Sequence, residues 1–497
     1  MKNWSEIKEY NGRNRIHIDG KPYLTLGIQY DYLNCTKIED FDYLFQHTVS
    51  LGCNTLFFPL RWLVMEPEEG KYNWEVLDHA IARCREYGLR MSLLWFGTNQ
   101  GGSARPAPDW VINDRKRFPR IIDEKGRERD GLCPNSESTL EAEKNSFNQL
   151  LNHLAEVDGK EHTVIMMQIE NEVCLYMSHE QSEISYARQQ PAMDFWTPRC
   201  YCDVCNALYQ KEGGSEFEFG VRSLIKYLNS LLEGQKKIFP VLTYVNFPIN
   251  PLRPGEDVEM YLEECHGVDF VAPDYYGFTP GDLAFAIQHF RRGRNIPFIA
   301  EHSTESVGDA AMNLYLSVCE HGVQGFSPWA IDHAFGWRAW RDGVREKPFV
   351  DRNGEWSDAA VSYGRAQRAM NCASRQIAAL AGTEDMMHYI SYGDPRKIEE
   401  RRWGIRWRLL TGKDGKCIVL RTGEDDFTIL GVDTLVALSP VKYGKSMLIE
   451  EGRWNDEQWV CERRISAAEV SEEKDIKGSD IGEIDLGKGT AYRIRLI

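Results

Sequence analysis

Two glutamates at the end of an apolar run have the residue type and the position for acid–base chemistry. Residues 163–176 read TVIMMQIENEVCLY, so Glu170 and Glu172 flank Asn171 where an expected strand ends. Period-two alternation places both glutamates on one face of a regular strand, so spacing alone does not decide which of them reacts. The ordinary alternative is that one or both form ion pairs with arginines of the fold.

A second carboxylate closes a later apolar run. The segment IPFIAEHS places Glu301 directly after residues 296–300. Glycoside hydrolysis uses two carboxyl groups that face each other across the scissile bond. One protonates the leaving oxygen, and the other attacks the anomeric carbon or activates water. Glu301 is the predicted partner of the first pair, and Asp274 and Glu305 are the alternatives.

The elements that must position these groups are eight short apolar runs separated by helix-length segments with polar patterning. Runs that are apolar on both faces are typical of parallel strands covered by helices, and their alternation with helices predicts a (β/α)8 TIM barrel. A doubly wound sheet is the alternative, but no glycine-rich phosphate loop follows the first run. The runs are 24–30, 54–60, 90–96, 163–169, 239–245, 268–273, 296–300 and 322–329, and helices are expected at 74–88, 140–159 and 222–237.

The pattern changes after about Ala379. Short alternating runs separated by Gly and Asp turns follow, which predicts an antiparallel β-domain. We therefore expect residues 1–375 to form a catalytic barrel with a short N-terminal extension, and residues 376–497 to form a smaller β-rich domain.

Several motifs carry a resemblance to a known family. In a barrel of this kind the carboxyl ends of the strands carry the chemistry. Asn-Glu closing the fourth strand and Glu closing the seventh resemble clan A retaining glycosidases. The ordered set GKPYLTLGIQY, LGCNTLFFPLRWLVMEPEEGKYNW, LRMSLLWFGTNQGG, APDWV, TVIMMQIENE, VDFVAPDYY, IPFIAEHS and VQGFSPWAID resembles β-galactosidase-like proteins of glycoside hydrolase family 35, from a bacterial branch with a β-rich C-terminal domain.

This resemblance implies a retaining exo-β-glycosidase, with β-galactosidase as the first choice, acting on a small oligosaccharide or β-glycoside. It assigns Glu172 as the acid/base, because in the clan the reactive glutamate directly follows Asn. It assigns Glu301 as the nucleophile and Asn171 as a ligand of the sugar 2-hydroxyl, and leaves Glu170 in a structural role. β-Glycosidases or transglycosylases of glucose, fucose or arabinose specificity, and a non-catalytic sugar-binding barrel, are the alternatives.

Other residues at strand ends are candidates for the substrate pocket. Tyr275 or Tyr276 could hold Glu301 through a phenolic hydrogen bond, and Trp329 matches the position of the clan's stacking platform. Packing in the barrel mouth is the alternative for each ring. Four further candidates close other strands: Arg61, Trp95, Asn99 and His302.

A cysteine string predicts a metal site. The segment PRCYCDVC places Cys200, Cys202 and Cys205 together, and Cys133 in GLCPNS is the expected fourth ligand. Clustered thiolates in a reduced protein commonly hold zinc, and four of them leave no open position for water, so the zinc would be structural. The arrangement resembles the structural zinc cluster of glycoside hydrolase family 42. Reduced thiols on a surface loop, or a catalytic metal, are the alternatives, but no HExxH motif is present.

Composition limits the partners and the compartment. The formal net charge of −16 disfavours nucleic acid as a partner, because an acidic chain repels phosphate. The chain has no run of 18 apolar residues, so no membrane span is predicted. Its N-terminal segment lacks the apolar stretch that a signal peptide would have. These features predict a cytoplasmic protein in which most of the 13 cysteines are free thiols. The related families are often trimers or dimers, so a homo-oligomer is a further expectation.

Overall fold

The computed structural model describes most of the chain. The described residues are 3–100, 103–173, 197–248, 256–276, 279–303, 309–333, 340–341, 344–345, 348–441, 446–465, 482–487 and 489–497. Glu305, one of the alternative partners for the catalytic pair, lies outside them.

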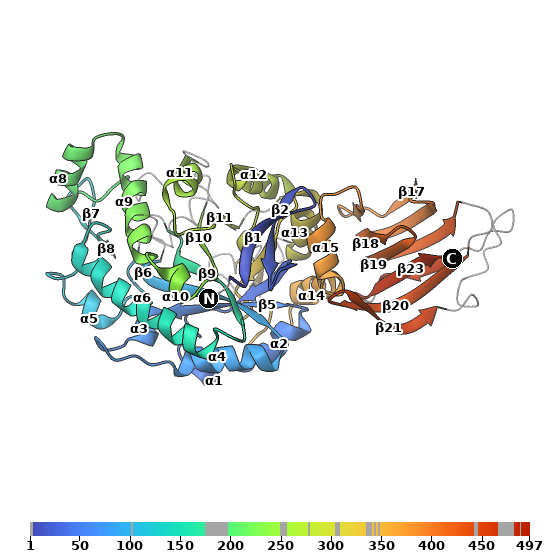
Figure 1. Ribbon diagram of the computed structural model, residues 1–497, viewed down its shortest axis with the longest axis horizontal. Helices are drawn as coiled ribbons and strands as arrows, with labels where there is room; N and C mark the ends of the chain where they lie inside the picture. The colour runs from blue at the N-terminus through green and yellow to red at the C-terminus, as the bar shows by residue number, and fades with distance from the viewer. Residues whose placement is uncertain are drawn as a thin grey trace.

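Eight parallel strands close into a barrel, as the eight apolar runs predict (Figure 1). Each predicted run contains or overlaps one strand, and the last strand pairs with the first to complete the ring. The TIM-barrel prediction is therefore confirmed. In chain order the strands are β4 (Thr25–Gln29), β5 (Thr55–Arg61), β6 (Arg90–Gln100), β9 (Val164–Asn171), β10 (Leu242–Pro248), β11 (Phe270–Tyr275), β12 (Ile299–Ser303) and β13 (Gly325–Trp329).

Helices cover the outside of the barrel, and their starts follow local capping chemistry. Ser136 begins the helix that follows it by accepting a hydrogen bond from the Thr139 N–H. Thr279 and Asp282 form a capping box at the start of α12. The longer helices are α2 (Leu44–Ser50), α4 (Glu75–Glu86), α6 (Glu137–Val157), α8 (Asp203–Glu212), α9 (Glu216–Leu231), α11 (Glu256–Glu264), α12 (Pro280–Phe290), α13 (Ala310–Tyr315) and α14 (Asp358–Asn371). Shorter elements are α1 (Ile38–Phe41), α3 (Trp62–Met65), α5 (Asp109–Ile112), α10 (Gln235–Ile238), a π-helix (Leu316–Glu320), and the hairpins β7 (Arg120–Ile122) with β8 (Glu128–Leu132) and β14 (Trp340–Arg341) with β15 (Val344–Arg345).

Alternation along each barrel strand separates two cores. On β6, Leu94 and Phe96 pack with the residues that fill the barrel interior, such as Phe270 on β11. Leu93 and Trp95, one position away, pack in the layer between the barrel and the helices. Both faces of the strands are therefore apolar, which is why the runs read as continuously hydrophobic.

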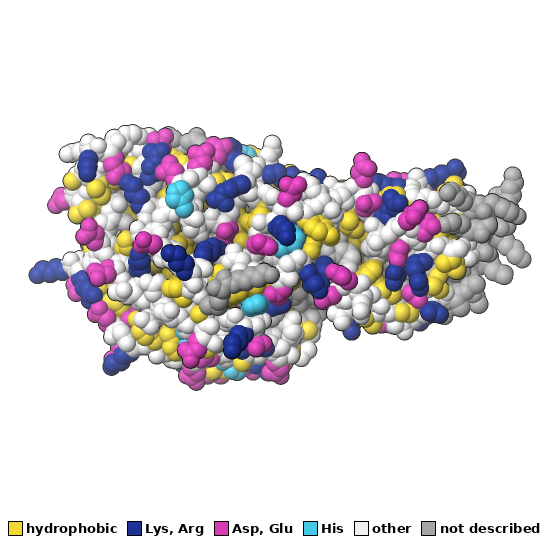
Figure 2. Space-filling view, viewed as in Figure 1, with side chains coloured by type: hydrophobic (Ala, Val, Ile, Leu, Met, Phe, Trp, Pro, Cys, Tyr) yellow, Lys and Arg dark blue, Asp and Glu magenta, His cyan; other side chains and the backbone are white. Residues whose placement is uncertain are grey.

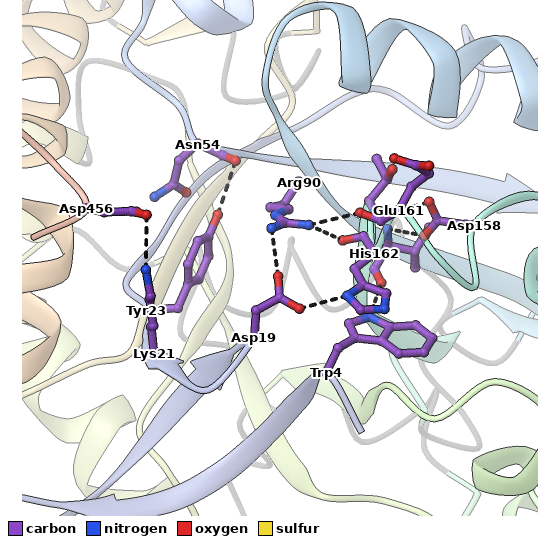
Figure 3. Close-up of polar contacts among 12 residues, drawn as sticks. Trp4, Asp19, Lys21, Tyr23, Asn54, Arg90, Asp158, Glu161, His162 and Asp456 are labelled. Atoms are coloured by element: carbon purple, nitrogen blue, oxygen red, sulfur yellow. Dashed lines mark hydrogen bonds and ion pairs between the residues drawn. The ribbon is translucent and has the colours of Figure 1, made fainter. Parts of the chain in front are cut away.

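Polar contacts join a small N-terminal sheet to the amino ends of the barrel strands β6 and β9 (Figure 3). It consists of β1 (Ser5–Tyr10), β2 (Arg13–Ile18) and β3 (Lys21–Pro22). Asp19 pairs with Arg90 at 2.9 Å and with His162 at 2.7 Å, and Trp4 stacks on the His162 ring with centroids 4.4 Å apart. Contacts on this face of a TIM barrel support stability, whereas chemistry belongs to the opposite face.

A hollow of about 570 Å³ opens beside this network. It is lined by residues 18–24, by the residues that precede β5 and β6, and by the hairpin that ends in Asp456. Lys21 pairs with Asp456 at 3.1 Å across it, so it lies where the barrel base meets the C-terminal sheet (Figure 3). Its position at the amino ends of the strands separates it from the predicted carboxylates.

The C-terminal part forms an antiparallel sheet, as the sequence predicts. Its main strand order is β16-β18-β19-β23-β20-β21, with β17 beside β18 and β22 beside β19. Helices α14 and α15 (Ser374–Leu380) lie between this sheet and the barrel (Figure 1). The strands are β16 (Met386–Ile390), β17 (Arg396–Arg402), β18 (Ile405–Gly423), β19 (Asp426–Pro440), β20 (Met447–Asn455), β21 (Gln458–Ile465), β22 (Gly482–Asp485) and β23 (Ala491–Leu496).

The two faces of this sheet pack differently. Trp407, Phe427 and Ile494 share a separate core, whereas Ile418 and Leu430 belong to the cluster that also contains the helices around the barrel. The proposed division at residue 375 falls within α15, so that helix contributes to both sides of the boundary. Acidic and basic side chains are interspersed over the visible face of both parts (Figure 2). Among the described helices, none has the length and apolar character to span a membrane.

Candidate active site

Three carboxyl groups meet at the carboxyl ends of the barrel strands. Glu172 follows β9, Asp274 lies near the end of β11, and Glu301 lies in β12. One carboxylate oxygen from each lies within 4.8 Å of the other two, and the three side chains are buried. Retaining glycosidases have carboxyl groups about 5–5.5 Å apart, whereas inverting enzymes separate them by roughly 6.5–9.5 Å. The structure thus brings together Glu172, the predicted partner Glu301 and the alternative partner Asp274.

The backbone at the end of β9 separates Glu170 from Glu172. Both residues have positive φ, +61° and +50°. Such left-handed conformations are uncommon for residues other than glycine and concentrate at functional sites. Because the strand is not regular here, period-two alternation does not hold. Glu170 points to the backbone of β6, while Glu172 reaches the other two carboxyl groups.

Among the described residues, no arginine pairs with Glu170, and its environment is structural. Its carboxylate accepts hydrogen bonds from the backbone N–H groups of Gly97, Thr98 and Asn99, at 3.2, 3.0 and 2.7 Å, and from the Thr98 hydroxyl at 2.9 Å. For Glu170 the ion-pair interpretation is therefore wrong in its partners, which are three main-chain N–H groups and one hydroxyl of the neighbouring strand. Burial raises the pKa of Glu170, and the nearby Glu143 carboxylate raises it further.

Asn246 connects the parts of the site. It lies on β10, is fully buried, and its Oδ1 accepts the Glu172 N–H at 3.1 Å. Its Nδ2 lies 2.9 Å from Asp274 Oδ1 and 3.3 Å from both Glu301 Oε1 and Asn171 Oδ1. Asn246 is not among the residues predicted from the sequence. The available signal was a polar residue immediately after the fifth apolar run, which is where a barrel strand presents its end to the site.

The tyrosine alternatives are distinguished by the structure. Tyr276 donates a hydrogen bond from its hydroxyl to Glu301 Oε2. Tyr275 points elsewhere and donates to the Thr279 carbonyl at 2.9 Å. Trp329 is 7% exposed and packs with Tyr276 and Tyr32, at the edge of the carboxylate cluster. Tyr276 and Trp329 therefore lie at the site, and Tyr275 belongs to the barrel–helix layer.

Two of the other predicted pocket residues face away from the carboxylates. Trp95 is fully buried among the helices and donates to Glu143 Oε1 at 2.8 Å. His302 is fully buried, and its ring nitrogens contact the Ser303 carbonyl at 2.6 Å and the Asn313 amide at 2.9 Å. Both side chains point to the outside of the barrel, because neighbouring residues of a strand face opposite sides. A position at the end of a strand was therefore not enough to place either residue in the pocket.

Arg61 and Asn99 occupy intermediate places. The Arg61 guanidinium lies 5.7 Å from the centre of the Tyr32 ring, on the side of the barrel mouth that includes Trp329. Its Nε is buried and makes no hydrogen bond within the described part of the chain. Burial lowers the pKa of Arg61. Asn99 contributes its backbone N–H to Glu170, as described above.

Burial sets the protonation of the central carboxyl groups. It raises the pKa of Glu172 from 4.5 to about 7. Burial is also the main cause that raises the pKa of Asp274 well above its ordinary value, followed by the charges of Glu301 and Glu172. Like charges at this separation repel by roughly 3–4 kcal/mol at an effective dielectric constant of 20, so the three groups do not all ionise together near neutral pH. The site therefore holds protons that an acid catalyst can deliver.

The four predicted cysteines form a second cluster. One sulfur atom from each of Cys133, Cys200, Cys202 and Cys205 lies within 4.8 Å of the others. Cys133 Sγ is 3.7 Å from Cys202 Sγ and 3.4 Å from Cys205 Sγ, too far for a disulfide, in which the sulfurs are about 2.05 Å apart. Such a group could hold a metal ion. The Cys133 loop comes before α6 and the other three lie at the start of α8, so a metal would join two segments that flank β9.

One family model matches part of the chain. Residues 39–210 match the β-galactosidase model of glycoside hydrolase family 42. A β-galactosidase of Thermus thermophilus is 26% identical over 235 residues, which cover 46% of this chain and 34% of that protein. The β-galactosidase BgaA of a Thermus species is 24% identical with the same coverage. The chain thus spans about a third of the length of these curated relatives.

Solved structures share the fold. The β-galactosidase of the Antarctic haloarchaeon Halorubrum lacusprofundi superposes with a TM-score of 0.52 at 16% identity, covering 75% of this chain and 60% of that one. The β-galactosidase of Bacillus circulans sp. alkalophilus gives a TM-score of 0.50 at 13% identity, covering 72% of this chain and 57% of that one.

The matched segment includes part of the site. It contains the four clustered cysteines, Asn171 and Glu172, and it ends before Glu301. The motifs along the chain predicted a resemblance to family 35, and the cysteine cluster alone predicted one to family 42. The comparisons instead support a resemblance to family 42 over residues 39–210, which include the barrel strands β5, β6 and β9, and they do not show the family 35 resemblance.

Proposed function

We propose that the protein is a retaining β-glycosidase, with β-galactosidase as its first assignment. The observation that carries this proposal is the approach of Glu172 and Glu301 to within 4.8 Å at the carboxyl end of a TIM barrel. The match to a β-galactosidase family over residues 39–210 supports the choice of sugar. The substrate would be a terminal β-linked sugar of a small oligosaccharide or glycoside.

The first step transfers the sugar to the enzyme. Glu301 attacks the anomeric carbon as its carboxylate, and Glu172 donates its proton to the leaving oxygen as the glycosidic bond breaks. The raised pKa of Glu172 keeps that proton available near neutral pH. Tyr276, which donates to Glu301 Oε2, would hold the nucleophile in orientation. Asn171 would bind the sugar 2-hydroxyl, a contact that strengthens as positive charge develops on the ring.

The second step returns the enzyme to its starting state. Glu172, now ionised, removes a proton from water, and the resulting oxygen nucleophile displaces Glu301 from the anomeric carbon. Two inversions give net retention of configuration. Trp329, beside Tyr276 at the edge of the site, would provide an apolar face for the sugar ring. Arg61 would border the substrate pocket beside Tyr32, on which its guanidinium lies.

A panel of 4-nitrophenyl β-glycosides tests the assignment. We expect turnover to be fastest with the galactoside, and slower with the glucoside, fucoside and arabinoside. Galactose and glucose differ only at the 4-hydroxyl, and a hydroxyl that the site binds specifically can give large discrimination. Proton NMR should detect the β-anomer as the first product. An α-anomer would reject double displacement, and sugar binding without turnover would indicate a non-catalytic barrel.

We further propose that the cysteine cluster holds structural zinc. Zn–S bonds of about 2.3 Å in a tetrahedron place neighbouring sulfurs ~3.8 Å apart. The 3.7 and 3.4 Å separations from Cys133 are close to that spacing, and four sulfur ligands suit a closed structural site. The zinc would brace the segments on either side of β9, which ends at the candidate acid/base. It would take no part in the reaction.

Metal removal should destabilise the protein before it affects chemistry. We expect purified protein to contain one zinc per chain by elemental analysis, and EDTA to lower its Tm by about 5 °C or more. Cys202→Ser should lose zinc and the response to EDTA, whereas Cys461→Ser, an exposed cysteine outside the cluster, should keep both. Residual folded protein should retain its kcat. Loss of turnover on chelation without loss of folded structure would instead indicate a catalytic metal.

A further inference from the structure

Asn246 contacts both members of the proposed catalytic pair, Glu172 and Glu301. Its side chain accepts the Glu172 N–H at 3.1 Å, and its own carbonyl accepts the Val173 N–H at 3.0 Å. One residue thus holds two consecutive amides of the segment in which Glu172 has a φ of +50°. A left-handed conformation of a glutamate persists only when its surroundings impose it. These two hydrogen bonds contribute to that constraint.

The other end of the same amide faces acceptors. Nδ2 lies 2.9 Å from Asp274 Oδ1 and 3.3 Å from Glu301 Oε1. Reversing the amide would point its oxygen at these carboxyl groups and its nitrogen at the Glu172 N–H, so only one orientation satisfies every neighbour. Asp274, through the shortest of these contacts, fixes that orientation. Asn246 itself is fully buried.

We infer that Asn246 is a positioning residue that sets the separation between the acid/base and the nucleophile. This inference rests on the proposed function and deepens it. The amide joins the backbone of Glu172 on one side to the carboxylate of Glu301 on the other, so a change in its length or donors moves the two reactive groups relative to each other. Asp274 acts through Asn246 by orienting the amide.

The surroundings of the amide define what a charge there would do. The titratable groups that face it or its Asp274 partner are Glu172 after β9, Tyr244 on β10, Asp274 and Tyr276 at the end of β11, and Glu301 on β12. Three of these five are carboxyl groups, which a new carboxylate would hold in their protonated form more strongly. Tyr276 is a phenol, and burial raises its pKa well above the ordinary value. Tyr244 is a neutral phenol, whose raised pKa keeps it so.

Two substitutions test the positioning role. Asn246→Asp keeps the acceptor for the Glu172 N–H but replaces the donor with a carboxyl oxygen. We expect kcat of this variant to fall about 100-fold and KM to change less than threefold. Both limbs of its pH profile should move to higher pH. Asn246→Ala removes both ends of the contact, and should lower kcat at least as much. Asp274→Asn retains an oxygen acceptor for Asn246 and should lower kcat less than tenfold.

Asn295 provides the matched control. It is also a buried asparagine, but it bonds only backbone groups: the Val271 N–H, and the Val271 and Phe290 carbonyls. Asn295→Ala should lower Tm and leave the kcat and pH limbs of the folded fraction unchanged. If Asn246→Ala behaves like Asn295→Ala, losing only stability, then Asn246 is structural and the inference is overturned.

A crystal structure of Asn246→Ala separates this inference from the proposed function. We expect the Glu172 and Glu301 carboxylates to move apart beyond 4.8 Å, the separation within which they lie in the wild-type chain. If the variant shows this displacement but the wild-type protein cleaves no glycoside, the proposed function is rejected and the positioning role stands. An unchanged separation would reject the positioning role, whatever the activity of the wild-type protein.

Discussion

Glu301→Ala should lower kcat roughly 10⁴- to 10⁶-fold on every glycoside that the wild-type protein cleaves. The substitution removes the group that forms the glycosyl–enzyme intermediate, and the remaining acid cannot replace a missing nucleophile. Glu301 is 4% exposed and lies within 4.8 Å of Glu172, so its loss leaves a small cavity beside the proposed acid/base. Initial rates with 4-nitrophenyl β-galactoside, compared at equal concentrations of folded protein, measure the effect.

Small anions should rescue this variant with a diagnostic product. Azide can occupy the space left by the carboxylate and attack the anomeric carbon once, so the product should be the α-glycosyl azide, with inverted configuration. Glu301→Gln is the matched control, because its amide fills the same space and should not be rescued. Rescue that yields the β-azide, or a Glu301→Ala variant with wild-type turnover, would show that another residue is the nucleophile. Asp274 would then be the next candidate.

The barrel could be predicted from the sequence because its strands carry a signal on both faces. Parallel strands under a helical layer bury every side chain, so each appears as an unbroken apolar run. The carboxylates that close the fourth and seventh runs then fall at the same end of the barrel. The cysteine cluster was also predictable, because three of its four members are close in sequence and clustered thiolates commonly bind a metal ion.

The details of the site depend on features that strand position does not contain. Glu170 and Glu172 diverge because both have left-handed backbone, and nothing in their spacing predicts it. Trp95 and His302 point outward because side chains alternate between the two faces of a strand. The sequence does not give the residue at which each strand starts, so it does not decide which face a ring occupies. Asn246 was missed because its importance comes from contacts with β9, β11 and β12, which are distant in the chain.

Glu172→Gln should lower kcat/KM about 10²- to 10⁴-fold for substrates with poor leaving groups, such as lactose or a methyl β-galactoside. Glutamine preserves the shape of the side chain but carries no proton to donate. The loss should shrink greatly with 2,4-dinitrophenyl β-galactoside, because that leaving group departs without protonation. Breakdown of the glycosyl–enzyme should then limit turnover, since no base activates water, and added azide should accelerate it. For this variant the azide product should keep the β-configuration, because Glu301 still reacts first.

The pH dependence gives the sharper test of the Glu172 assignment. Burial raises the pKa of Glu172 to about 7, and the reaction starts from its protonated form. The wild-type kcat/KM should therefore be highest below that pH and should fall about tenfold for each unit above it as the proton is lost. Glu172→Gln has no group to titrate there, so its alkaline limb should disappear. A wild-type limb near pH 7 that persists unchanged in Glu172→Gln would assign the titration to a different group, and undiminished turnover with lactose would remove Glu172 from the acid role.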